Sequence, residues 1–134
     1  MGRAYPLTGR AILVVEDEPL ILLEITALFQ SAGATVLSAM DLPTAIELVS
    51  TSGPSAAVLD YGLGADKVQA LCALLGERGI PFMFYTGYAD PQQRFPTVLV
   101  VQKPANTDTL LAAMSDLVDD KRIDADRMHT MQRA

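Results

Sequence analysis

The chain alternates short β-rich runs with amphipathic stretches at helical spacing, and this pattern limits the folds that are open to it. Five such runs can be counted, at residues 11–15, 35–38, 56–59, 82–85 and 98–101. The first run, AILVV, is continuously apolar, as is typical of a central parallel strand that helices cover on both faces. The pattern predicts a three-layer α/β fold, in which a doubly wound, five-stranded parallel sheet lies between helices.

Helices are predicted after the first three strands and after the fifth, over residues 19–32, 42–49, 66–78 and 107–118. Asp41 is the expected N-cap of the second helix, and either Asn106 or Thr107 is expected to cap the last one. The connection between the fourth and fifth strands, residues 89–97, contains Pro91 and Pro96. Because proline interrupts a helix, we expect a shortened fourth helix there.

Length and composition indicate one folded domain, since 134 residues of which 50% are hydrophobic can bury a single core. We divide the chain into an N-terminal extension (1–9), a folded domain (10–119) and a charged C-terminal tail (120–134) that we expect to be frayed or disordered. No stretch is apolar enough to cross a membrane or to act as a signal peptide. A single cysteine, Cys72, excludes an internal disulfide and suits a cytoplasmic location.

The charge balance argues against nucleic acid as a direct partner. Ten basic residues against sixteen acidic ones give a net charge of −6, which is the wrong sign for a domain that binds a phosphate backbone unaided.

Polar residues follow the apolar strands where a ligand would bind. Glu16 and Asp17 follow the first strand, Asp60 the third, Thr86 the fourth and Lys103 the fifth. In an open parallel sheet, ligands bind outside the carboxyl ends of the strands. Three carboxylates brought together there repel one another unless a cation neutralises them, and oxygen ligands with room for water suit Mg²⁺. A structural ion pair with Lys103 is the alternative explanation.

These strand ends resemble those of the receiver domain of two-component response regulators. The matching segments are VVEDEP after the first strand, VLD at the third, TG at the fourth and QKP at the fifth. The resemblance covers residues 10–119 and implies a flavodoxin-like sheet with strand order 2-1-3-4-5. It also implies a signalling switch, not an enzyme with a separate substrate.

The resemblance implies a phosphoryl acceptor and a metal site. Asp60 would accept a phosphoryl group from a histidine kinase or a histidine phosphotransfer protein, with Mg²⁺ as the cofactor. Asp17 would contact the ion directly and Glu16 would act through water. Asp60 itself and the backbone carbonyl of Gly62 would be further ligands.

Lys103 and Thr86 would act on the phosphoryl group, the lysine by pairing with an oxygen and the threonine by donating its hydroxyl and moving its loop. Pro104 resembles the family's cis-proline. The segment FYTGY is similar to the F-x-T-G-Y pattern of a subgroup of stand-alone receivers. Val100 stands where many receivers have an aromatic switch residue, and we hypothesise that Tyr88 replaces it.

A second apolar row on the first helix, Leu20, Leu23 and Ala27, offers a docking surface for the kinase or phosphotransfer helices. The alternative is that neighbouring loops cover this row.

Three functions are compared. The preferred one is a single-domain response regulator that signals through protein partners, because we expect no room for a fused output module. The second is a receiver-like protein-binding scaffold that acts without phosphorylation. The third, a haloacid-dehalogenase-like phosphatase, is disfavoured because that family has a second aspartate where this chain has Gly62.

Overall fold

A single parallel sheet forms the centre of the molecule. The computed structural model describes residues 5–87 and 95–119, and in these ranges five parallel strands pair in the order β2-β1-β3-β4-β5. They are β1 (Ala11–Val15), β2 (Thr35–Ala39), β3 (Ala56–Leu59), β4 (Phe82–Thr86) and β5 (Leu99–Gln102). The predicted α/β fold and strand order are therefore confirmed.

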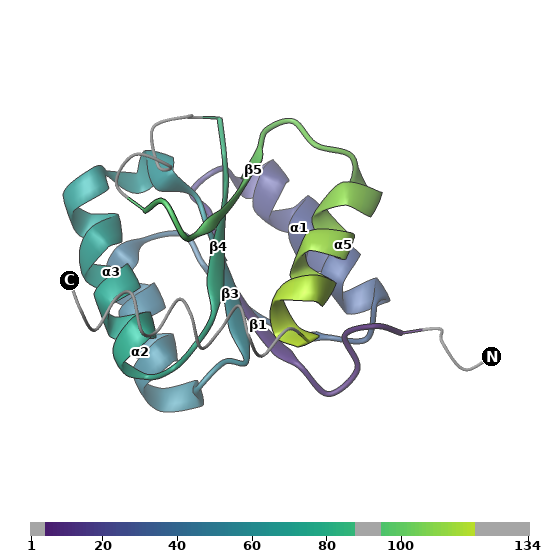
Figure 1. The fold of residues 1–134 in the computed structure, drawn as a ribbon, viewed down its shortest axis with the longest axis horizontal. Helices are drawn as coiled ribbons and strands as arrows, with labels where there is room; N and C mark the ends of the chain where they lie inside the picture. The colour runs from purple at the N-terminus through teal and green to yellow at the C-terminus, as the bar shows by residue number, and fades with distance from the viewer. Residues whose placement is uncertain (1–4, 88–94, 120–134) are drawn as a thin grey trace.

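Helices cover both faces of this sheet, as predicted (Figure 1). On one face lie α1 (Pro19–Ser31) and α5 (Thr107–Asp119), and on the other lie α2 (Leu42–Ser52) and α3 (Ala65–Glu77). A short 3-10 helix, η1 (Tyr61–Leu63), joins β3 to α3. Residues 88–94, where most of the shortened fourth helix is expected, lie outside the described residues, as do 1–4 and the tail 120–134. No helix in the described ranges is long and apolar enough to span a membrane.

Side chains alternate between the two faces of each strand, and this divides the core in two. The core between the sheet and α2/α3 contains Leu13, Leu59, Phe82 and Phe84 among its buried residues. The core between the sheet and α1/α5 contains Ile12, Val58, Met83, Tyr85 and Val101 among its own. Alternate residues along a strand therefore face the same core. The same alternation applies to the residues that directly follow each strand.

Two predicted caps can be compared with the structure. The Asp41 carboxylate accepts a hydrogen bond from the Thr44 N–H at 2.9 Å, so it caps α2 as predicted. At α5 the structure selects Asn106 over Thr107, because the Asn106 side-chain oxygen accepts from the Thr109 N–H at 2.7 Å.

The N-terminal segment contributes to the core, which the sequence pattern did not indicate. Leu7 is fully buried against the α1/α5 core, and its N–H donates to the Ala32 carbonyl at 2.8 Å. A Cβ built on Gly33 would lie 2.6 Å from the Thr8 hydroxyl oxygen, so only glycine lets the two segments approach this closely. The described part of the expected extension is thus packed on the end of α1.

Candidate functional site

The structure brings all five predicted side chains to one edge of the sheet, which we call the carboxyl edge. Glu16 and Asp17 directly follow β1, Asp60 follows β3, Thr86 ends β4 and Lys103 follows β5. Because every strand is parallel, all these ends point the same way. The shared edge follows from topology alone, whereas the contacts between the side chains depend on register.

Register places Glu16 beside Asp60. Val15 pairs with Leu59 across β1 and β3, so Glu16 and Asp60 are the next residues along their strands. Both continue the rows that face the α1/α5 core, as does Lys103, which follows Val101 by two residues. The three charged side chains therefore meet on the same side of the sheet.

Lys103 contacts two carboxylates at once. Its Nζ lies 2.8 Å from Glu16 Oε1 and 3.3 Å from Asp60 Oδ2. The side chains of Lys103, Glu16 and Asp60 are 17%, 2% and 10% exposed. The ion pair that we raised as an alternative to a metal site is present, but one lysine cannot neutralise two carboxylates, and Asp17 adds a third nearby.

Opposing effects act on the pKa of the Glu16 carboxyl. Burial raises the pKa of this carboxyl, and the charge of Asp60 acts in the same direction. The hydrogen bond from Lys103 and a second one from the Glu18 N–H, at 3.1 Å, lower the pKa without cancelling the effect of burial. The Glu16 carboxylate is thus held by partners at both oxygens and still carries a cost for being ionised.

Lys103 shows the complementary balance. Burial by itself would lower the pKa of its ammonium, but the hydrogen bond to Glu16 and the charge of Asp60 outweigh it, so the pKa is raised. Lys103 therefore stays positively charged at every physiological pH.

Asp60 is oriented by two contacts. Its Oδ1 accepts a hydrogen bond from the Gly62 N–H at 2.9 Å, and its Oδ2 contacts Lys103. The first contact caps η1, and it fixes the carboxylate plane at the point where the chain leaves β3. Gly62 thus reaches Asp60 through its N–H, while the predicted role of its carbonyl as a metal ligand stays a prediction.

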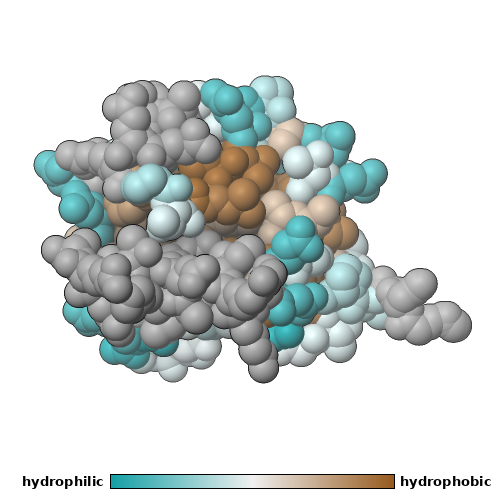
Figure 2. Space-filling model, in the orientation of Figure 1, coloured by the Kyte–Doolittle hydropathy of each residue, from teal (hydrophilic) through white to brown (hydrophobic). Residues whose placement is uncertain are grey.

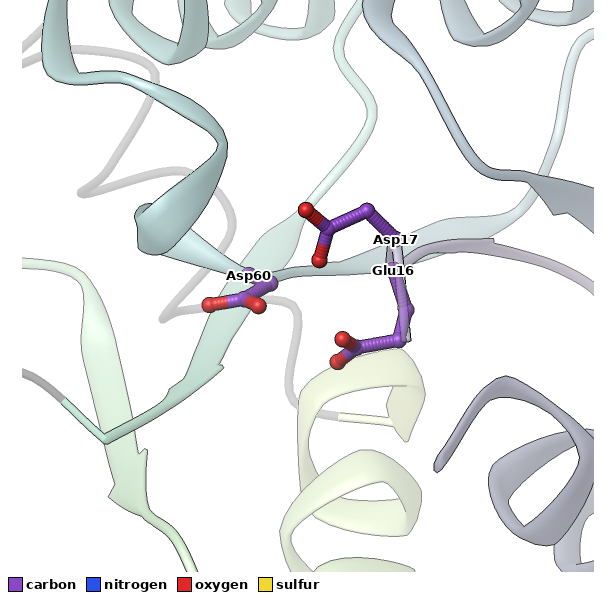
Figure 3. Close-up of side chains that lie close together, drawn as sticks. All are labelled: Glu16, Asp17 and Asp60. Atoms are coloured by element: carbon purple, nitrogen blue, oxygen red, sulfur yellow. The ribbon is translucent and has the colours of Figure 1, made fainter. Parts of the chain in front are cut away.

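Three carboxylates converge on one space (Figure 3). Ligand oxygens of Glu16, Asp17 and Asp60 all lie within 4.8 Å of one another. Asp17 is exposed to solvent, whereas Glu16 and Asp60 are buried. A set of hard oxygen donors that is open to water on the Asp17 side fits a divalent cation such as Mg²⁺.

Thr86 and Tyr85 line the same edge from β4. Thr86 is fully buried, and its carbonyl accepts a hydrogen bond from the Lys103 N–H at 2.8 Å. The Tyr85 hydroxyl accepts from the Ala105 N–H at 3.3 Å, and Lys103 Nζ lies 5.6 Å from the centre of the Tyr85 ring. Sequence reasoning missed Tyr85, although an aromatic residue beside Thr86 and two strand positions beyond the buried Met83 could have signalled it.

An aromatic cluster on the opposite face was also missed. The Tyr61 ring, directly after Asp60, packs edge-on against Phe84 at 5.5 Å and Phe95 at 6.4 Å between ring centres. Val100, the position without the expected aromatic, pairs with Phe84 and packs against this same core. Tyr88, the hypothesised replacement, lies outside the described residues.

The predicted docking row is exposed. Leu20 and Leu23 on α1 are 75% and 64% exposed, and Ala27 is exposed as well. A different apolar area is visible at the edge strand β5, where Leu99 is exposed (Figure 2). Of the two, only the α1 row begins beside Asp17.

Comparison with solved structures gives this arrangement a context. The Methanospirillum hungatei JF-1 receiver domain protein (CheY-like) matches with a TM-score of 0.75 at 21% identity, over 84% of this chain and 96% of that one. The chain has the fold of response-regulator receiver domains. The Erythrobacter litoralis PhyR response regulator REC domain matches at 26% identity with a TM-score of 0.71, over 83% of this chain and 91% of that one.

One similar protein is much longer than this chain. The Bartonella quintana anti-anti-sigma factor PhyR matches at 26% identity with a TM-score of 0.70, over 87% of this chain but only 52% of that protein. This chain thus spans about half the length of that protein.

No protein-family model matches the sequence, and no curated protein matches it either. Taken together, the structural neighbours support a receiver-type signalling role.

Proposed function

We propose that this protein is a response regulator whose Asp60 accepts a phosphoryl group from a histidine kinase or a histidine phosphotransfer protein in a Mg²⁺-dependent reaction, and that it signals through protein partners. The observation that carries the proposal is the contact of Lys103 Nζ with Asp60 Oδ2 at 3.3 Å, beside the converging carboxylates of Glu16 and Asp17. This arrangement supports the proposal because it brings together an oriented carboxylate, a lysine ammonium and further carboxylates that would hold a metal ion.

Asp60 would act as the nucleophile. One of its carboxylate oxygens forms a bond to phosphorus while the bond from phosphorus to the donor breaks, and the donor leaves with that electron pair. The attack brings together two negatively charged groups, so its barrier depends on nearby positive charge. A bound Mg²⁺ would reduce this repulsion, and Asp17 and Asp60, with Glu16 through water, are the residues that would hold it.

Lys103 and Thr86 would hold the transferred group. The Lys103 ammonium has three N–H donors, and two of them face Glu16 and Asp60, so one is left for a phosphoryl oxygen. The phosphoryl group carries about −1.5 to −2 charges and replaces the single negative charge of the Asp60 carboxylate, so the site gains a net charge of about −0.5 to −1 beside a largely buried lysine. The Thr86 hydroxyl would donate to the new group and carry the change into the segment that follows β4.

The decisive experiment is to incubate the protein with acetyl phosphate and Mg²⁺ and to measure its intact mass. We expect a gain of one phosphoryl group that disappears in Asp60→Asn and when EDTA replaces Mg²⁺. Asp108→Asn is the matched control, because this aspartate is exposed in the first turn of α5 and is not one of the predicted site residues, and it should be labelled like the wild type. No gain with any phosphodonor would favour a scaffold that acts without phosphorylation.

The exposed row on α1 is the proposed docking surface for the phosphodonor protein. It begins three residues after Asp17, so a helix packed on Leu20 and Leu23 would place its histidine near Asp60. Leu23→Glu should slow phosphotransfer from the kinase by about tenfold or more, because truncating or charging a buried interface anchor has an effect of this size. Labelling by acetyl phosphate should stay unchanged. Ile46→Glu, at an exposed apolar position on α2, is the control. Equal slowing in both variants would contradict docking on α1.

A further inference from the structure

Tyr85 places a phenol where the core needs only an apolar side chain. It lies on β4 at the face covered by α1 and α5, and it is buried in the same core as Met83, two residues earlier. Met83 fills its place without any strong hydrogen-bonding group. A buried phenol, by contrast, needs a partner for its hydroxyl, and that need is a cost that an apolar residue would avoid.

The partner of this hydroxyl belongs to the segment that carries Lys103. The Ala105 N–H donates to the Tyr85 hydroxyl oxygen at 3.3 Å, and the Lys103 N–H donates to the carbonyl of the neighbouring Thr86 at 2.8 Å. Two consecutive residues of β4 therefore hold the backbone on both sides of Pro104. This pair of contacts fixes where the Lys103 side chain starts.

The ring of Tyr85 also meets the end of that side chain. Lys103 Nζ lies 5.6 Å from the ring centre, which is within the range of a cation–π contact. The ring attracts the ammonium without taking up one of its N–H donors in a strong hydrogen bond. The ammonium is thus placed by Glu16, Asp60 and Tyr85, and it keeps a donor for an incoming group.

Register explains why Tyr85 is at this point. Leu59 pairs with Phe84 across β3 and β4, so Asp60 and Tyr85 are the next residues along. Val101 pairs with Tyr85 across β4 and β5, and Lys103 continues the row of Val101. Tyr85 therefore stands between the strand that carries the acceptor and the strand that carries the lysine.

We infer that Tyr85 is a positioning residue for Lys103: its hydroxyl holds the backbone at Ala105 and its ring holds the ammonium beside Asp60. This inference rests on the proposed function, because the role of Lys103 is to pair with the phosphoryl group on Asp60. Tyr85 contacts Ala105 and Lys103 at this site, so its effect on the reaction would pass through Lys103.

The test uses Tyr85→Phe, which removes only the hydroxyl, and Tyr85→Leu, which also removes the ring. Met83→Leu is the control, as an apolar change in the same core and on the same strand. Phosphorylation is followed at increasing acetyl phosphate with Mg²⁺ fixed, which separates the rate at saturation from the half-saturating concentration. Hydrogen exchange at the Ala105 N–H is measured by NMR in the unphosphorylated proteins.

We expect the saturated rate to fall about fivefold in Tyr85→Phe, and by roughly a further fivefold in Tyr85→Leu, since each contact is of the size of one neutral hydrogen bond or one cation–π contact. The half-saturating concentration should stay within about twofold of the wild type, because Lys103 acts on the reacting group and not on initial binding. The Ala105 N–H should exchange faster in both Tyr85 variants and not in Met83→Leu.

Two results would overturn the inference. If Tyr85→Phe and the wild type show the same saturated rate, the hydroxyl does not position Lys103. If Ala105 exchange in Tyr85→Phe is unchanged, the backbone contact is not a constraint in solution, and this readout holds even if Tyr85→Leu fails to fold. A wild-type protein that takes up no phosphoryl group would instead overturn the proposed function, and the positioning role would fall with it.

Discussion

Two ion-paired sites lie at opposite ends of the strands, one at the carboxyl edge and one at the amino-terminal end. At the carboxyl edge, Lys103 contacts Glu16 at 2.8 Å and Asp60 at 3.3 Å. At the other edge, just before β1, the Arg10 guanidinium contacts Asp119 at the end of α5 at 3.1 Å. The separations are alike, but the side chains of Arg10 and Asp119 are 40% and 61% exposed, against 17% or less for the three residues around Lys103.

This difference in exposure decides what each site can do. Water screens the exposed pair, so its contribution to stability is small and changes little when another charge arrives. At the carboxyl edge screening is weaker, and Coulomb energies at contact distance rise from about 1 kcal/mol in water to about 4 kcal/mol at an effective dielectric constant of 20. A charge added at Asp60 would therefore be felt by Lys103 and Glu16, which is what a phosphorylation switch requires.

The largest expected effect is that of Lys103→Met, which leaves Glu16 and Asp60 with no cation between them. We expect the free energy of unfolding to fall by about 3 kcal/mol at pH 8 in EDTA, in the range measured for breaking a buried pair. Burial already raises the pKa of Glu16, and losing Lys103 raises it further, so Glu16 takes up a proton as the pH falls. The loss should therefore be smaller at pH 5 than at pH 8.

Urea unfolding at the two pH values measures this effect. Lys67→Met is the control, because Lys67 is exposed on α3. An equal loss at both pH values would show that the buried carboxylates do not depend on Lys103.

Glu16→Gln should have a smaller effect, about 1 kcal/mol or less at pH 7, because Lys103 keeps Asp60 and a glutamine oxygen can still accept from the Glu18 N–H. The pH dependence is the sharper readout. Because its pKa is raised in the folded state, Glu16 contributes fully to the stability of the wild type at pH values below its ordinary pKa of 4.5. This contribution is lost as the pH rises through the folded-state pKa. Stability of the variant should fall less over that window in urea unfolding, and a curve parallel to the wild type would contradict the assignment.

The smallest effect is expected at the exposed pair. A double-mutant cycle with Arg10→Ala and Asp119→Ala should give a coupling free energy of about 0.5 kcal/mol or less, since the side chains are 40% and 61% exposed and water screens their charges. This coupling should disappear at high salt, where screening is complete over a few ångströms. A coupling as large as the effect of Lys103→Met would refute the view that burial distinguishes the two sites.

Sequence periodicity was sufficient for the fold because each element carries its own signal. The continuous apolar run of β1 and the cap at Asp41 are local features, and the structure confirms both of them. The buried Leu7 was missed, because one leucine among polar and turn residues has no period to indicate burial.

The polar residues of the site were predictable for a similar reason. A charged residue that ends an apolar strand is conspicuous in the sequence, and a parallel sheet brings such ends to one edge. The aromatic residues Tyr61, Phe84 and Phe95 gave no such signal, because their packing joins segments whose registers are unknown until the sheet is assembled.

By itself, the sequence determined the order of strands and helices and the set of charged residues at the strand ends, since hydrophobic period and chain direction are encoded locally. Only the tertiary structure decided which of these charges touch. Register and side-chain parity place Glu16, Asp60 and Lys103 on one face with Tyr85, while Asp17 stays in solvent. These contacts depend on the relative positions of three strands far apart in the chain, and burial then sets how strongly their charges interact.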